Sequence, residues 1–410
     1  MALVPHQFRF RLQPALQARA DLIWRELCED DDYDIPLLQR MAGQRPYAFL
    51  GPPLASNWYE EVLLAYYAQD PARFRMEARM LPSTFDALLQ LIQARQPPAA
   101  PTGRPRRDLR KRLLVYLCWL GANDSYRRIQ QLCDVSEGAL ANIIDEMSEA
   151  IIQALARLIP GAAASGDLLE GSRQYLHARL NFNATQYADG SRFFVNLRHA
   201  DFTDYEGCQS IQVFGTACRY LDRPYFTAIA HGVPGGVDEA VVFEQTGLNA
   251  IVRDFYARGY ITIFDRGHSV RRWSPRPFDQ AELNCNERKT WNYQTSRWKI
   301  IEHAWAYVKL RSRRVGGVMD MDSFERIKKV IGSAVVLHNF LVISHDFDGG
   351  PEIDAGFEDS LARVRNARQA LLAARDQAVP ADDDLEDGQA ARDVLIGQLV
   401  ALTGPEAYPH

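Results

Sequence analysis

The chain lacks any long uninterrupted run of apolar residues. None of its 410 residues fall in an apolar stretch of about 18 residues, the length that spans a bilayer. The amino terminus also lacks the apolar segment of a secretory signal. We therefore expect a soluble, intracellular protein with no membrane partner.

Cysteine is sparse, and its spacing forms no recognisable pattern. The sequence contains no Cys-x-x-Cys pair and no histidine at zinc-ligand spacing, which argues against a disulfide framework and against a zinc finger. A reducing compartment is the natural expectation. The six cysteines are Cys28, Cys118, Cys133, Cys208, Cys218 and Cys285.

An overall excess of positive charge is also missing. The formal net charge is −5 and the isoelectric point is about 6.0, so the protein is not coated with phosphate-binding side chains. Any DNA-binding surface must be local. The 47% hydrophobic and 24% charged residues instead indicate a folded chain of two or three domains.

The first part of the chain predicts an all-α region over residues 1–95. Apolar residues at helical spacing indicate helices near 58–68 and 83–95. A linker rich in Pro and Arg follows at 96–108, and it overlaps a basic segment, 104–112, with six basic residues and one acidic residue. That segment is either a phosphate-contacting arm or nuclear-import signal, or a solvated first turn of helix.

A helix-turn-helix pattern is expected within residues 109–165. The predicted helices run over 109–120, 126–133 and 137–158, with a tight turn between the last two. The third helix is acidic for one that would read DNA. The alternative, a helical bundle that supports an enzyme core, therefore stays open.

The fold class expected for the rest is α/β, with a mixed sheet flanked by helices. Strands are predicted at 192–197, 210–217, 225–230 and 260–264, and helices from about 238 and at 296–313 and 321–343. The order β-β-β-α-β-α is that of an RNase H-like nuclease domain, which we place at 170–343. An acidic tail at 344–410 would end in a helix.

Three acids stand where such a fold would need them. Asp189 precedes the first predicted strand, Asp265 directly follows the last, and Glu302 lies on a helix beside an apolar stripe. Phosphodiester cleavage uses two divalent ions about 4 Å apart, and carboxylates hold such ions. Taken singly, each acid is also compatible with a surface or capping residue. Taken together, they indicate a catalytic and metal-binding triad of Asp189, Asp265 and Glu302, with two Mg²⁺ or Mn²⁺ ions.

The order of several sequence blocks resembles the PIF/Harbinger DDE transposases and the nucleases derived from them. The blocks are 205–213, 232–243, the segment Phe264-Asp-Arg-Gly-His268, the segment Ile301-Glu-His-Ala-Trp305, and 336–340. The resemblance covers residues 110–342, including the helix-turn-helix pattern. It implies Mg²⁺-dependent DNA strand cleavage and transfer by the three acids already named.

The resemblance carries further expectations about location and partners. It implies a nuclear protein that binds double-stranded DNA at transposon ends or targets, and a Myb-like partner protein. An additional cytoplasmic location and a homo-oligomer are left open. Glu239, as part of Asp238-Glu239, and His303 differ from the family pattern and are candidate accessory residues. A decayed, domesticated DNA-binding or adaptor protein, or a metal-dependent hydrolase of another substrate, therefore remain alternatives.

A local basic stretch overlaps the predicted site. Residues 266–314 contain twelve Lys and Arg against four acids. Tryptophans in this stretch could stack on unpaired bases, although a place in the core is the preferred interpretation. The residues predicted to bind DNA are Arg106, Arg107, Arg110, Lys111, Arg271, Arg272, Lys309, Arg311, Arg313 and Arg314.

Overall fold

The computed structural model describes residues 58–95 and 108–346, with gaps at 123, 181–182, 198–201, 205–206, 231, 238, 266, 269, 280–281, 284, 298 and 322. All described residues belong to one compact unit. The predicted linker up to 107, with Arg106 and Arg107, and the predicted tail from 347 lie outside the described residues. In the part that is described, no helix is long and apolar enough to span a membrane.

The N-terminal part is helical, as predicted. A π-helix η2 (Glu60–Tyr66) leads into α3 (Tyr67–Gln69), α4 (Pro71–Ala78) and α5 (Pro82–Gln93), and then come α6 (Leu109–Gly121), α7 (Tyr126–Cys133) and α8 (Glu137–Leu155). Polar side chains begin these helices: Asp70 accepts from the backbone N–H of Arg73 at 3.0 Å, and Ser125 accepts from that of Arg128 at 3.2 Å. The three helices of the predicted helix-turn-helix pattern are thus present.

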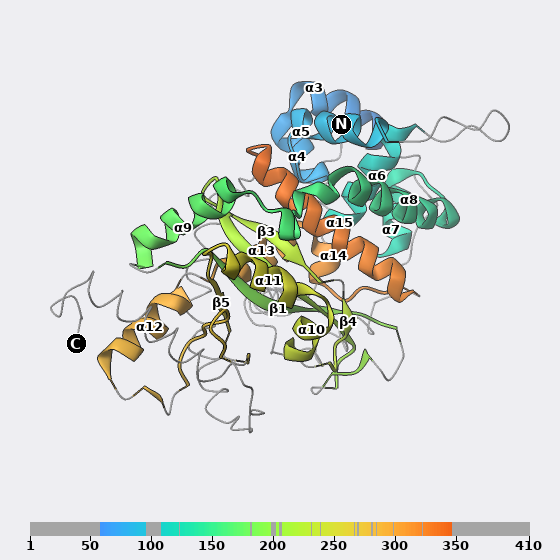
Figure 1. The fold of residues 1–410 in the computed structure, drawn as a ribbon. Helices are drawn as coiled ribbons and strands as arrows, with labels where there is room; N and C mark the ends of the chain where they lie inside the picture. Colours follow the sequence, from blue (N-terminus) through green and yellow to red (C-terminus); the bar gives the residue numbers. More distant parts are fainter. Residues whose placement is uncertain are drawn as a thin grey trace, which may run out of the picture. The chain divides into compact units, whose positions relative to one another are not determined.

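Two acids of α8 pair with one neighbouring helix. Asp145 lies 2.6 Å from Arg326 and Glu149 lies 2.8 Å from Lys329, both on α15 (Phe324–Ile343). Figure 1 shows α15, far along the chain, running beside α8. This packing explains the acidity of α8 and favours the alternative in which these helices support the core.

The sheet is mixed and combines distant parts of the chain. After η3 (Ala156–Leu158), η4 (Gly161–Ala163) and α9 (Gly166–Leu180) come β1 (Gln186–Phe194), β2 (Ser210–Tyr220), β3 (Arg223–Ile229), β4 (Val233–Pro234) and β5 (Thr262–Phe264). The strand order is β3-β2-β1-β5, and β4 pairs with β2. β1 is antiparallel to β2 and parallel to β5. The α/β class with a mixed sheet is confirmed.

In this region the prediction from the sequence missed one helix, and it placed the start of one strand wrongly. Helix α9 was not predicted, and β1 begins at Gln186, so Asp189 lies within the strand instead of before it. The polar residues that hid this strand are buried, and Gln186 is bonded across the sheet: its amide donates to Thr262 at 2.9 Å and accepts from Thr227 at 2.7 Å. A central strand of this kind shows no alternation of apolar and polar residues.

Helices cover both faces of the sheet (Figure 1). One face packs against α10 (Glu239–Gln245) and α11 (Leu248–Ala257). The other packs against α13 (Ile300–Arg311) and α15 and shares one hydrophobic core with the N-terminal helices. The predicted helix at 296–313 is in fact broken, because α12 (Asn286–Arg297) ends before α13 starts and α14 (Arg313–Gly316) follows.

Polar residues of α15 attach to the outer strand β3. The side-chain amide of Asn339 accepts from the N–H of Phe226 at 2.9 Å and donates to its carbonyl at 2.8 Å. His338 donates from Nε2 to the carbonyl of Pro224 at 2.9 Å, and burial lowers the pKa of this histidine to about 3. These contacts tie the 336–340 block to the edge of the sheet.

Candidate functional site

Asp189 and Asp265 follow matching positions on two neighbouring parallel strands. The register of β1 and β5 ends with Ala188 beside Phe264. Asp189 is the next residue of β1, and Asp265 directly follows the end of β5. Ala188 and Phe264 belong to the core cluster that contacts α10 and α11. Because side chains alternate between faces, both acids belong to the opposite face, which α13 covers. They line one small cavity and are only 5% and 9% exposed.

Trp305 docks α13 onto the sheet beside Asp189. In β2, Gly215 pairs with Asp189, and a Cβ added at Gly215 would lie 2.9 Å from Cζ2 of the Trp305 indole. The indole Nε1 donates to the backbone carbonyl of Asp189 at 3.4 Å. Glu302 lies one turn before Trp305 and therefore on the same side of the helix. The missing side chain at Gly215 thus brings Glu302 toward the two strand acids.

Lys299 connects the second and third acids. Its Nζ lies 3.1 Å from Oδ1 of Asp265 and 2.6 Å from Oε1 of Glu302. Lys299 caps α13, and Glu302 lies in the first turn, where the positive end of the helix dipole stabilises a carboxylate. Lys299 also lines the cavity of Asp189 and Asp265. In the sequence, Lys299 is one of the twelve basic residues of 266–314, and its spacing to Glu302 is that of a helical ion pair.

His268 anchors the turn that follows Asp265. Its backbone N–H donates to the carbonyl of Asp265 at 3.3 Å, and its ring is buried. The ring centroid lies 5.1 Å from that of Phe214 and 5.2 Å from that of Phe264, in edge-to-face contact with both. A histidine can therefore fill the place of an aromatic residue here, and the position of Asp265 is supported by packing.

The three carboxylates do not form a finished metal site. Among the described residues, no group of three Asp, Glu, His or Cys side chains is close enough together to hold an ion. The donor chemistry nevertheless fits Mg²⁺ or Mn²⁺, because the oxygens are hard carboxylate ligands and a cationic group already bridges two of them. Asp189, Asp265 and Glu302 would be the residues that hold the metal.

The two candidate accessory residues lie on different helices. Glu239 is the first residue of α10, and His303 follows Glu302 on α13, where it is half-buried. Neither position assigns a chemical step to the residue. Their accessory roles remain predictions.

Several of the predicted DNA-binding side chains are used inside the fold. Lys309 is 7% exposed and lies over the ring of Phe193, and Arg314 is 3% exposed and lies over Trp119. A side chain buried in this way does not reach a phosphate at the surface. The predicted side chains that remain at least partly accessible are Arg110, Lys111, Arg271, Arg272 and Arg313. The guanidinium of Arg311 is bound inside the fold, where it donates to the carbonyl of Arg79 at 2.9 Å.

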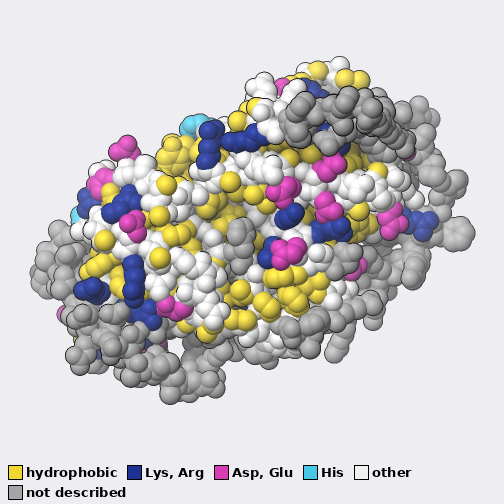
Figure 2. Space-filling model, turned by 45° about the vertical axis from the view of Figure 1, so that its right-hand side comes forward, with side chains coloured by type: hydrophobic (Ala, Val, Ile, Leu, Met, Phe, Trp, Pro, Cys, Tyr) yellow, Lys and Arg dark blue, Asp and Glu magenta, His cyan; other side chains and the backbone are white. Residues whose placement is uncertain are grey.

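Basic side chains do not gather into one field on the face that Figure 2 shows. Lys and Arg lie there in several small groups among acidic and hydrophobic side chains. Arg271 is paired with Glu244, and Arg110 lies 3.1 Å from Asp86. Trp273 and Trp291 are buried, which confirms their place in the core, and the side chain of Trp298 lies outside the described residues.

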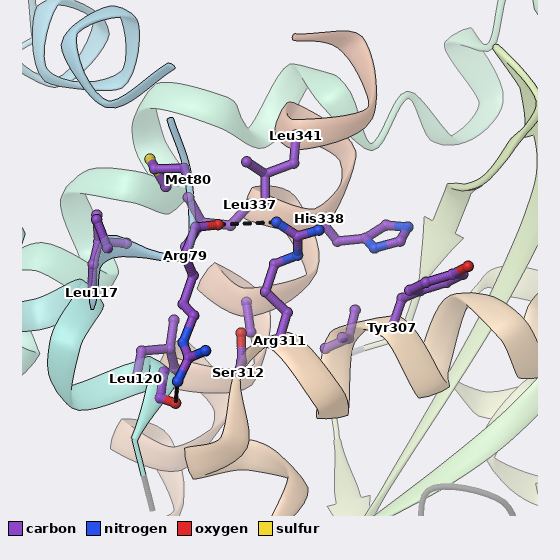
Figure 3. A pocket seen from close by; sticks show the side chains of 14 residues that line it. Arg79, Met80, Leu117, Leu120, Tyr307, Arg311, Ser312, Leu337, His338 and Leu341 are labelled. Atoms are coloured by element: carbon purple, nitrogen blue, oxygen red, sulfur yellow. Dashed lines mark hydrogen bonds between the residues drawn. The ribbon is translucent and has the colours of Figure 1, made fainter. Parts of the chain in front are cut away.

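A second cavity lies away from the acids and is lined by α6, α13 and α15. Figure 3 shows Arg79 and Arg311 along it: Arg79 donates to the carbonyl of Gly121 at 2.9 Å, and Arg311 donates to that of Arg79 at 2.9 Å. Burial lowers the pKa of Arg311 to about 10. Arg79 thus joins the end of α4 to α6, and Arg311 joins α13 to these N-terminal helices.

The chain matches no protein-family model, no curated protein and no solved structure. The function is therefore inferred from the geometry of the acids and from the sequence blocks that surround them.

Proposed function

We propose that this protein is a metal-dependent DNA endonuclease or strand-transfer enzyme of the DDE type, with an RNase H-like catalytic domain. The observation that carries the proposal is the placement of the acids. Asp189 and Asp265 follow matched positions on the neighbouring parallel strands β1 and β5, and Glu302 lies on the helix that covers them and shares Lys299 with Asp265. The sheet order also supports an RNase H-like domain.

In the proposed mechanism the protein supplies the ligands and holds them in place. Divalent ions would neutralise the charge that develops on the attacking and leaving oxygens of a DNA phosphate. Asp189 and Asp265 would hold the ions on the rigid sheet, and Glu302 would complete their coordination from α13. The apolar residues that line the cavity exclude water and strengthen these electrostatic contacts.

A nicking assay with supercoiled plasmid and Mn²⁺ tests the proposal. The wild-type chain should nick the plasmid, whereas Asp265→Asn should lose at least about a hundredfold in rate because one ligand loses its charge. Asp254→Asn is a matched control, since Asp254 is an exposed acid of α11 that pairs with Arg258. Equal nicking by wild type and Asp265→Asn, or none across several DNA substrates, would refute the assignment.

The resemblance of the sequence blocks to the PIF/Harbinger DDE transposases supports three further parts of the proposal. These are nuclear localisation, binding of double-stranded DNA and a Myb-like partner. The partly accessible basic side chains named above would then contact phosphate. Salt dependence of DNA affinity tests this part, because neutralised phosphates release counterions and give a negative log-log slope. A flat slope would favour a hydrolase that acts on another substrate.

One observation favours a second candidate, a decayed DNA-binding or adaptor protein. The ammonium of Lys299 lies between two of the three acids, and a permanently bound ammonium could replace the metal in a site that has lost activity. Titration calorimetry with Mn²⁺ separates the two candidates. Binding that is abolished by Asp265→Asn supports the enzyme, and its absence in wild type supports the adaptor.

A further inference from the structure

We propose that Lys299 is a positioning residue that closes the acid site, and that a divalent metal ion must displace its ammonium group to bind. This inference rests on the proposed function. It starts from the two contacts of Lys299 Nζ, at 3.1 Å to Asp265 and at 2.6 Å to Glu302. A metal ion that uses the same two oxygens must first break both contacts.

The surroundings of Lys299 explain why the closed arrangement is stable. Asp265 is 9% exposed, and the cavity that it shares with Lys299 is lined largely by apolar side chains. Charges in such a setting attract each other more strongly than at the surface, and a carboxylate there needs a positive partner. The ammonium supplies that charge and keeps the first turn of α13 against β5.

The lysine side chain is suited to leave when a stronger cation arrives. Its four-carbon stem is flexible, so the ammonium can move without a shift of the backbone. A monovalent ion would merely replace one positive charge with another, whereas a divalent ion brings one more positive charge to the two carboxylates that Lys299 bridges. The site should therefore admit divalent ions and exclude monovalent ones.

Because the ion binds only molecules in which Lys299 has left the acids, the apparent metal affinity equals the intrinsic affinity multiplied by the fraction of such molecules. If that fraction is about one tenth or less, removing the ammonium should tighten Mn²⁺ binding about tenfold or more. A purely structural lysine predicts the opposite change. Its loss would loosen the acids and weaken binding.

The experiment is Mn²⁺ titration calorimetry on the full chain. Lys299→Met keeps the length of the side chain without its charge and should bind Mn²⁺ about tenfold more tightly than wild type. Lys299→Arg keeps the charge and should bind no more tightly than wild type. Lys328→Met is the matched control, because Lys328 forms an equally spaced pair with Glu325 at 2.7 Å on α15. It should leave the affinity unchanged.

Thermal melts give a second readout and guard against misfolding. Without metal, Lys299→Met should melt below wild type because the acids repel one another, and Mn²⁺ should raise its melting temperature by more than that of wild type. Lys299→Gln provides the same test if Lys299→Met does not fold.

The outcomes separate this inference from the proposed function. Tighter binding by the neutral variants, with binding still measurable in wild type, supports the inference. Binding that appears only when Lys299 is removed overturns it, because the ion then does not displace the ammonium, and favours the adaptor. Unchanged or weaker binding by these variants, with Asp265→Asn still abolishing it, overturns the role of Lys299 and leaves the enzyme proposal intact. No binding by any variant overturns both.

Discussion

Gly215→Ala probes how α13 is held over the acids. The added Cβ would lie 2.9 Å from Cζ2 of Trp305 and 3.3 Å from the carbonyl of Ala228. The indole has little room to move, because its centroid lies 4.5 Å from that of Phe226 and 5.9 Å from that of Phe193. The ring and the helix that carries it must therefore shift.

The expected change in the free energy of unfolding is the sum of two opposing effects. Overpacking a core costs about 1–3 kcal/mol. Replacing a strand glycine recovers about 0.5–1 kcal/mol of chain entropy. We expect Gly215→Ala to lower the free energy of unfolding by about 1–2 kcal/mol, and to lower Mn²⁺-dependent nicking by more than the loss of folded protein explains, because Glu302 moves with the helix.

Urea unfolding and the nicking assay measure these two effects. Gly171→Ala is the control, because a Cβ there meets nothing within 4 Å. Trp305→Phe removes the indole atom that clashes with the new Cβ. It should therefore lower the free energy of unfolding less in the Gly215→Ala background than in wild type. The reasoning is refuted if Gly215→Ala is as stable and active as wild type, or if the two substitutions are simply additive.

Three further substitutions test the contacts that hold the fold. Asn339→Leu should cost about 3 kcal/mol in urea unfolding, because it leaves the buried N–H and C=O of Phe226 without the amide; a loss below about 1 kcal/mol would contradict this. His338 has a folded pKa lowered to about 3, so its neutral form stabilises the fold above the unfolded pKa near 6.5. That contribution falls by about 1.4 kcal/mol per pH unit as pH drops below 6.5. His338→Gln should therefore show a smaller loss of unfolding free energy than wild type between pH 7 and pH 4. Equal losses in the two proteins would contradict this prediction. Gly121→Ala should destabilise by about 1–2 kcal/mol, because its Cβ would lie 2.7 Å from Cγ and Nε of Arg79; an unchanged melting temperature would show that the arginine moves aside freely.

The sequence predicted most elements whose apolar pattern is regular. β2, β3 and β5 lie where alternation or short apolar runs placed them, as do α5, α6 and α7. The start of β1 was missed because Gln186 is a buried polar residue that bonds to its neighbours across the sheet. α9 has a weak apolar pattern, with Leu169 and Leu176 as its buried apolar residues, which explains why it was not predicted.

In the candidate site, too, some residues were predicted from the sequence and others were not. Asp189, Asp265 and Glu302 could be selected from strand ends, a helix and sequence blocks, and two of them line one cavity. Lys299 was not selected, because its spacing to Glu302 indicates only a helical ion pair and nothing in the sequence indicates a contact with Asp265. Its contact with Asp265 depends on the break between α12 and α13, which local helical propensity did not predict.

The amide of Asn339 has a consequence for self-association. β3 is the outer strand of its sheet, and an outer strand offers free N–H and C=O groups with which another polypeptide can pair. Asn339 occupies both of these groups at Phe226 and behaves like a short piece of an additional strand. The side chain that fixes α15 to the sheet thereby also protects this edge from intermolecular strand addition and aggregation.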